Sequence, residues 1–141
     1  VENMIKLCKR LNLPCYINDE QLEITRDKIK FKDCCRKYGV PVVKEYASID
    51  EVDEYPVIVK PTDRAGSIGI SIAYSFEELE KAYQYAYDLS IEKRVIIEKY
   101  IHDADKVDFY YLAENGNLTL LASCDTVNAQ NNDGAMVVQT A

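Results

Sequence analysis

The sequence lacks several features that would place it in particular classes of protein. It has no run of 18 apolar residues that could span a membrane, no basic start with a small-residue cleavage site, and no low-complexity tract. Of its 141 residues, 48% are hydrophobic, which is enough to bury one sizeable core. We therefore expect a globular, cytoplasmic protein without a membrane partner.

Basic charge and metal-ligand spacing are also scarce. The net charge is −7, whereas a nucleic-acid surface needs a basic stripe that displaces counterions. The five cysteines form no C-x-x-C pair, and His102 is the single histidine. We expect no nucleic-acid partner, no zinc site, and thiols that mostly fill core positions in a reducing compartment. A nucleotide remains compatible with this charge, because a phosphate responds to cations within roughly 8 Å.

Both ends of the sequence favour a fragment of a longer protein. The chain opens on Val1 rather than Met and ends at Ala141, directly after the apolar residues 135–138. Residues 2–12 carry a helical apolar face, and residues 13–17 predict a short strand.

The rest of the chain predicts helices and strands in mixed order. Thr25 can cap a helix over residues 26–38, which Gly39 ends. A short helical segment follows Ser48, and Ser75 opens a helix to about residue 90 through a capping box. Strands are predicted at residues 42–46, 57–60, 70–74, 94–100, 107–113 and 118–123, with a type I′ turn at 115–116 and a loop at 125–134. The prediction is an α+β fold with a mixed or antiparallel sheet and helices on one side.

The strongest functional signal lies between residues 55 and 71. Lys60 ends a buried apolar strand just before a loop of small and polar residues, where its ammonium can reach phosphate oxygens. Gly66 and Gly69 allow positive φ, so that backbone N–H groups can converge on an anion, and Ser67 adds a hydroxyl donor. Neither common phosphate-binding fingerprint is present. The residues alone therefore leave a second interpretation open, an ordinary turn that needs glycine.

Four segments in this order resemble the ATP-grasp superfamily, especially its carbamoyl-phosphate-synthase-like and carboxylate-amine ligases. They are residues 25–28 with the helix that ends in 38–42, then 56–61, 66–70 and 97–101. The resemblance runs over residues 23–125 and implies a glycine-rich loop over nucleotide phosphates, held between two α+β lobes. It further implies that residues 1–22 are the tail of a preceding N-terminal domain. Residues 23–141 would be an ATP-grasp nucleotide-binding region that is incomplete at its C-terminal end.

The resemblance also implies which residues contact the phosphates. Lys28 and Lys60 match two lysines that contact the phosphates of ATP. Gly66, Ser67 and Gly69 match the mobile phosphate loop. For Lys28, a solvated lysine at a helix start remains the alternative, because Lys30 and Lys32 lie beside it.

The adenosine contacts follow from the same resemblance. Glu98 marks the hinge strand, where the Lys99 carbonyl would accept from the adenine amino group and the Ile101 N–H would donate to a ring nitrogen. Asp105 stands seven residues after Glu98, where the family usually has a glutamate that holds the ribose hydroxyls. An exposed loop acid is the alternative for Asp105.

Two departures from the family bear on chemistry. Asp63 and Arg64 stand where many members are richer in glycine, so either a phosphate tolerates Asp63 or Asp63 points away and pairs with Arg64. The family's magnesium ligands and transfer arginine lie in a later segment, so we expect ATP and Mg²⁺ as cofactors with the metal ligands outside this chain. We interpret the oxygen-bearing residues Asp125, Asn128, Asn131 and Asp133 as loop polarity, because their spacing fits no calcium loop.

By this resemblance, the parent protein is an ATP-dependent ligase that activates a carboxylate as an acylphosphate. The chain alone is expected to lack turnover, and the carboxylate substrate stays open, as does a homo-oligomeric state. Two other functions remain: a non-catalytic nucleotide-binding module, and an interaction module in which the Lys60 loop is only a turn.

Overall fold

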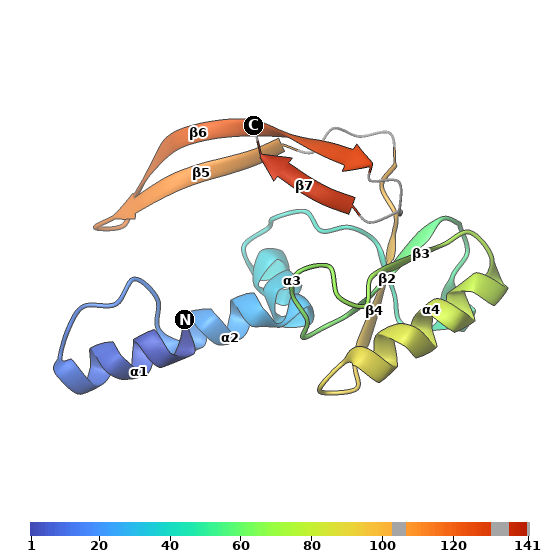
Figure 1. The fold of residues 1–141 in the computed structure, drawn as a ribbon, viewed down its shortest axis with the longest axis horizontal. Helices are drawn as coiled ribbons and strands as arrows, with labels where there is room; N and C mark the ends of the chain where they lie inside the picture. Colours follow the sequence, from blue (N-terminus) through green and yellow to red (C-terminus); the bar gives the residue numbers. More distant parts are fainter. Residues whose placement is uncertain (103–106, 131–135, 141) are drawn as a thin grey trace. The chain divides into compact units, whose positions relative to one another are not determined.

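The computed structural model describes residues 1–102, 107–130 and 136–140 (Figure 1). The chain divides into two compact units, Val1–Tyr100 and Ile101–Ala141. Among the described helices, none is long and apolar enough to cross a membrane.

The first unit is built on an antiparallel sheet. Its strands are β1 (Glu45–Tyr46), β2 (Val57–Pro61), β3 (Ser71–Ala73) and β4 (Val95–Lys99), in the order β1-β4-β2-β3. Strand β2 alternates between buried and half-buried residues, with Val57 and Val59 fully buried. Because side chains alternate between the faces of a strand, Lys60 points to the face opposite Val57 and Val59.

Helix α4 (Phe76–Leu89) covers the apolar face of this sheet. Leu79, Ala82 and Ala86 of the helix form one buried cluster with side chains of all four strands, among them Val57 and Ile97. The predicted helix start is confirmed, because the Ser75 hydroxyl accepts from the Glu78 amide (3.3 Å). The 3₁₀ turn η1 (Ile49–Glu51) lies where a short helical segment was predicted.

The predicted helix over residues 26–38 is wrong at its start. Helices α1 (Glu2–Leu11), α2 (Asp19–Arg26) and α3 (Lys28–Lys37) follow one another, and Asp27 rather than Thr25 caps α3. The Asp27 carboxylate accepts from the amides of Ile29 (2.8 Å) and Lys30 (3.0 Å). The Thr25 hydroxyl instead donates back to the Gln21 carbonyl inside α2 (2.9 Å), an ordinary role for threonine within a helix.

The predicted strand at residues 13–17 is also wrong. After Asn12 ends α1 in a left-handed conformation, these residues form an irregular connection to α2. Apolar residues in so short a run favour a strand only when a neighbouring strand pairs with them, and no described strand pairs here.

The second unit contains the strands β5 (Val107–Glu114), β6 (Asn117–Gln130) and β7 (Met136–Thr140), in that order. Asn115 (φ 51°) and Gly116 (φ 79°) both have the positive φ that a type I′ turn requires, as predicted. The loop predicted over residues 125–134 is wrong in its first half, because β6 continues to Gln130 and pairs with β7. Asn131 and Asp133 lie outside the described residues.

Candidate functional site

Lys60 and Glu98 meet on the sheet face opposite α4. Glu98 lies on β4 directly across from Ile58 of β2, and its residue exposure is only 5%. One carboxylate oxygen of Glu98 pairs with the Lys60 ammonium, and the other pairs with the ammonium of Lys32. The structure therefore places Lys60 on the sheet face opposite α4, beside the predicted hinge residue Glu98, and Lys32 joins them there.

Lys28 reaches the same region from α3. Its ammonium donates to the carbonyl oxygens of Pro61 (2.9 Å) and Arg64 (2.6 Å), and its backbone amide donates to the carbonyl of Thr62 (3.1 Å). Burial lowers the pKa of Lys28, and the positive charge of Lys60 lowers it further. Lys28 is thus a half-buried lysine near a second lysine, and its contact with a phosphate stays a prediction.

The loop between β2 and β3 combines an exposed tip with a packed base. Residues 65–68 are exposed, and Gly66 (φ 68°), Ser67 (φ 59°) and Gly69 (φ 76°) all have positive φ. A Cβ on Gly69 would lie 2.6 Å from Cγ of Pro61, whereas one on Gly66 would meet no atom within 4 Å. Glycine is therefore required at the base by packing, while the backbone at the tip is open for an approaching ligand.

Asp63 points away from this loop tip. Its carboxylate accepts from the Glu92 amide (2.7 Å) and the Ser90 hydroxyl (3.1 Å), after the end of α4. Burial opposes ionisation of Asp63, but these donors outweigh it and hold the pKa below its ordinary value. The predicted pairing with Arg64 is wrong, because the Arg64 Nε donates to the Leu89 carbonyl (2.6 Å). Both side chains serve to anchor the loop.

The hinge residues are described in part. Lys99 ends β4, where its amide donates to the Lys44 carbonyl (3.0 Å) and its ammonium pairs with Glu54 (3.0 Å). Ile101 is exposed and belongs to the second unit. Asp105 lies outside the described residues. The contacts expected with adenine and ribose therefore stay predictions.

Two features near the site were not predicted. Lys32 lies one helical turn after Lys28, so the spacing of four residues on α3 was the signal that could have revealed it. The second feature is the pairing of Asp27 with Arg94, which precedes β4. Burial opposes ionisation of Asp27, but the Lys30 amide and the Arg94 guanidinium lower its pKa. This pair holds the start of α3 against the end of β4 that lies beside Pro61.

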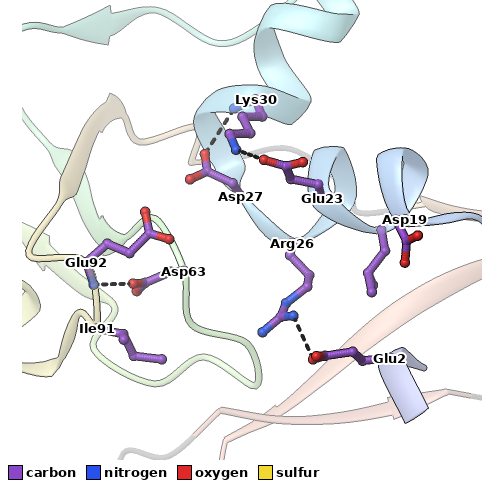
Figure 2. Close-up of a pocket in the computed structure, with 10 residues that line it drawn as sticks. Glu2, Asp19, Glu23, Arg26, Asp27, Lys30, Asp63, Ile91 and Glu92 are labelled. Carbon is purple, nitrogen blue, oxygen red and sulfur yellow. Dashed lines mark hydrogen bonds and ion pairs between the residues drawn. The ribbon is translucent and has the colours of Figure 1, made fainter. Parts of the chain in front are cut away.

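A separate cavity of about 380 Å³ opens beside α2 (Figure 2). Its lining comprises Glu2, Asp19, Leu22, Glu23, Arg26, Asp27, Lys30, Asp63, Ile91 and Glu92. Carboxylates outnumber cations here, and the two cations, Arg26 and Lys30, pair with Glu2 and Glu23. The excess of negative charge makes this cavity unsuitable for phosphate groups. Within the described ranges, no cluster of His, Cys, Asp and Glu side chains could hold a metal ion.

Comparison with known proteins decides the family. The family model described as the C-terminus of D-ala D-ala ligase matches residues 24–132. The chain belongs to this ATP-grasp family. The assignment confirms the predicted superfamily and the α+β class of the fold.

Relatives of this ATP-grasp chain include several ligases and carboxylases. It is 30% identical over 114 residues to the arginine-specific carbamoyl phosphate synthase large chain of Neurospora crassa, covering 75% of this chain and 10% of the relative. It is 34% identical over 76 residues to D-alanine--D-alanine ligase of Fusobacterium nucleatum, covering 54% and 26%. The solved biotin carboxylase domain of Hydrogenobacter thermophilus 2-oxoglutarate carboxylase, in complex with MgADP, ADP and bicarbonate, superposes with a TM-score of 0.75 at 25% identity.

The ATP-grasp chain is short beside these relatives. The structural match covers 93% of this chain but 32% of the solved carboxylase chain. The match to this short part therefore does not show the activity of a whole protein that contains the chain.

Proposed function

We propose that this chain is the ATP-binding part of an ATP-dependent ligase, and that Lys28, Lys60 and the loop 65–69 hold the phosphate groups. The observation that carries the proposal is the convergence of the two lysines. Lys28 comes from α3 and Lys60 from β2, yet the Lys28 ammonium donates a hydrogen bond to the carbonyl of Pro61, the residue after Lys60. Two ammonium groups thus lie near one exposed, positive-φ loop on a chain of net charge −7.

The chemistry expected of these groups is positioning and electrostatic stabilisation. Lysine is a compact cation suited to phosphate oxygens, and amides at Gly66 and Ser67 can donate to the same anion. Charge on a transferring phosphoryl group would be stabilised without a covalent intermediate on the protein. Mg²⁺, when bound, would neutralise further phosphate charge, and its ligands are expected outside these residues. The Hydrogenobacter structure with MgADP supports both cofactors at this level.

The adenosine part of the proposal rests on the family. The Lys99 carbonyl and the Ile101 N–H would contact the adenine ring, Asp105 would hold the ribose, and Glu98 would mark the hinge strand. The exposed position of Ile101 is compatible with a ligand contact.

The proposal extends to the parent protein. There, ATP would phosphorylate a carboxylate to an acylphosphate, and a nucleophile would displace the phosphate. We further propose that residues 1–22 belong to the tail of a preceding domain, and that the protein works in the cytoplasm. Its carboxylate substrate is the remaining partner to be identified, together with a possible second copy of the chain.

The test is the thermal midpoint of the chain with and without millimolar Mg-ATP. A ligand that binds only the folded state adds about 2.7 kcal/mol at 100 times its dissociation constant, which raises the midpoint by several degrees. We expect this shift with ATP, a smaller one with GTP, and its loss in Lys60→Ala. Lys81→Ala, an exposed substitution on α4, is the matched control and should keep the full shift.

The alternatives give different results. An interaction module in which the loop is only a turn predicts no shift with any nucleotide. A non-catalytic nucleotide-binding module predicts the same shift as a ligase, but the full-length protein would then bind ATP without hydrolysing it in the presence of any carboxylate.

A further inference from the structure

Three charged side chains form a linked group on the sheet face opposite α4: Lys60, Glu98 and Lys32. Glu98 is almost fully buried and holds one lysine on each carboxylate oxygen. The side chain of Lys60 is 22% exposed, and that of Lys32 is 12% exposed. The three charges thus run from a more accessible lysine to a less accessible one.

The two lysines differ in how they are held. The Lys32 ammonium lies 2.6 Å from a carboxylate oxygen of Glu45 and 3.3 Å from the Val43 carbonyl, in addition to Glu98. Lys32 therefore lies among two carboxylates, with which it forms ion pairs, and one carbonyl oxygen, to which it donates a hydrogen bond. In the part of the chain that the structure describes, Glu98 is the ion-pair partner of Lys60, which leaves Lys60 with donors to offer elsewhere.

We infer that Lys32 is a positioning residue that allows Lys60 to leave Glu98 for a nucleotide phosphate. The inference rests on the function proposed above. A buried carboxylate that loses its sole counter-charge is strongly destabilised. Glu98 keeps Lys32 when Lys60 moves, so the movement leaves no unpaired buried charge. Without Lys32, the same movement would leave the buried Glu98 carboxylate without a counter-charge, so Lys60 would stay paired with it.

Glu45 and Arg36 complete the support for Lys32. Arg36 pairs with the second oxygen of Glu45 (2.7 Å), so Glu45 retains a cation of its own. Burial opposes ionisation of Glu45, but Lys32 and Arg36 together lower its pKa. Lys32 is therefore fixed from the side of β1, away from Lys60, and does not need to move when a ligand arrives.

The first experiment measures Lys60 without any nucleotide. Competitive acetylation followed by mass spectrometry gives the reaction rate of each lysine, with exposed Lys81 as the internal reference. In Lys32→Met we expect Lys60 to react several-fold more slowly, because it stays paired with Glu98. Lys32→Arg keeps the charge and should restore the rate, and Lys32→Met combined with Glu98→Gln should abolish the slowing. If Lys32→Met does not fold, Lys32→Gln serves in its place.

The second experiment measures the dissociation constant of Mg-ATP by calorimetry on the same variants. We expect roughly tenfold weaker binding in Lys32→Met, equivalent to about 1.4 kcal/mol, and near wild-type binding in Lys32→Arg. An unchanged Lys60 rate in a folded Lys32→Met that still binds ATP as tightly as wild type would overturn this inference alone. A slowed Lys60 rate in a chain whose wild type binds no ATP would instead overturn the proposed function and retain the charge linkage.

Discussion

The Lys28 ammonium donates to the Arg64 carbonyl at 2.6 Å, across 36 residues of sequence. With the second contact to Pro61 it fastens the first turn of α3 to the loop between β2 and β3. The same lysine is proposed to meet a phosphate, so loop geometry and nucleotide affinity should depend on one side chain.

Replacing Lys28 with Met should therefore weaken both properties. Each hydrogen bond from the charged donor contributes about 1.5–3 kcal/mol when buried, and partial solvent exposure reduces the sum to on the order of 1–2 kcal/mol. We expect a lower midpoint in urea denaturation and at least about tenfold weaker Mg-ATP binding. Lys30→Met is the matched control, because Lys30 lies on the same helix and its ammonium makes an exposed pair with Glu23. Equal losses in both variants would contradict the assigned role of Lys28.

The two loop glycines should respond differently to alanine. Gly66→Ala adds a Cβ in open space and meets only the penalty of positive φ, about 1 kcal/mol. Gly69→Ala places a Cβ 2.6 Å from Pro61 and 3.3 Å from Leu89, so it should destabilise the fold by at least about 2 kcal/mol. Urea denaturation of both variants checks the order, and a larger loss for Gly66→Ala would show that the loop tip is more constrained than its surroundings indicate.

The charge pair between Asp27 and Arg94 should appear in the pH dependence of stability. The pKa of Asp27 in the folded chain is below its ordinary value of about 3.9. Its contribution is therefore fully present above that value and is lost as the pH falls through the lower folded pKa. Asp27→Asn keeps a capping side chain but loses the charge, and should lower the unfolding free energy at pH 7 by on the order of 1 kcal/mol.

The difference between Asp27→Asn and wild type should shrink as the pH falls below the ordinary carboxyl pKa and through the lower folded pKa of Asp27. Urea denaturation of both proteins at pH 7, 5 and 3 measures this difference in unfolding free energy. Asp50→Asn, which removes an exposed carboxylate from η1, is the control. A difference that stays constant over this range would mean that Asp27 stabilises α3 by hydrogen bonding alone.

Local patterns predicted the parts of the fold that local interactions form. Strand β2 was recognisable because an apolar run ends in Lys60, and α4 because Ser75 and Glu78 mark its start. The hairpin at Asn115 and Gly116 was recognisable because both residues tolerate positive φ. Each of these signals lies within a few residues of the structure that it specifies.

Distant partners explain what the sequence did not reveal. Thr25 and Asp27 are both capping residues, and the choice of Asp27 involves Arg94, 67 residues further along. The last part of β6 reads as a polar loop because its own residues are rich in Asp and Asn, and the strand becomes apparent only through its pairing with β7. For the candidate site, local chemistry and family resemblance predicted Lys60 and the glycines as phosphate contacts, and these contacts stay predictions. The contact between Lys32 and Glu98 was missed because it joins α3 to β4.

The exposed loop tip offers a direct test of where the nucleotide lies. Trypsin can cleave after Arg64, next to the exposed residues 65–68, and after the exposed Lys37 at the end of α3. If the loop amides converge on a phosphate, Mg-ATP should slow cleavage after Arg64 at least several-fold and leave cleavage after Lys37 unchanged, since local ordering protects only the ordered segment. Lys60→Ala should remove the protection. Equal slowing at both bonds would instead indicate a general stabilisation of the first unit by a ligand that does not contact the loop, because cleavage then follows the population of the globally opened chain.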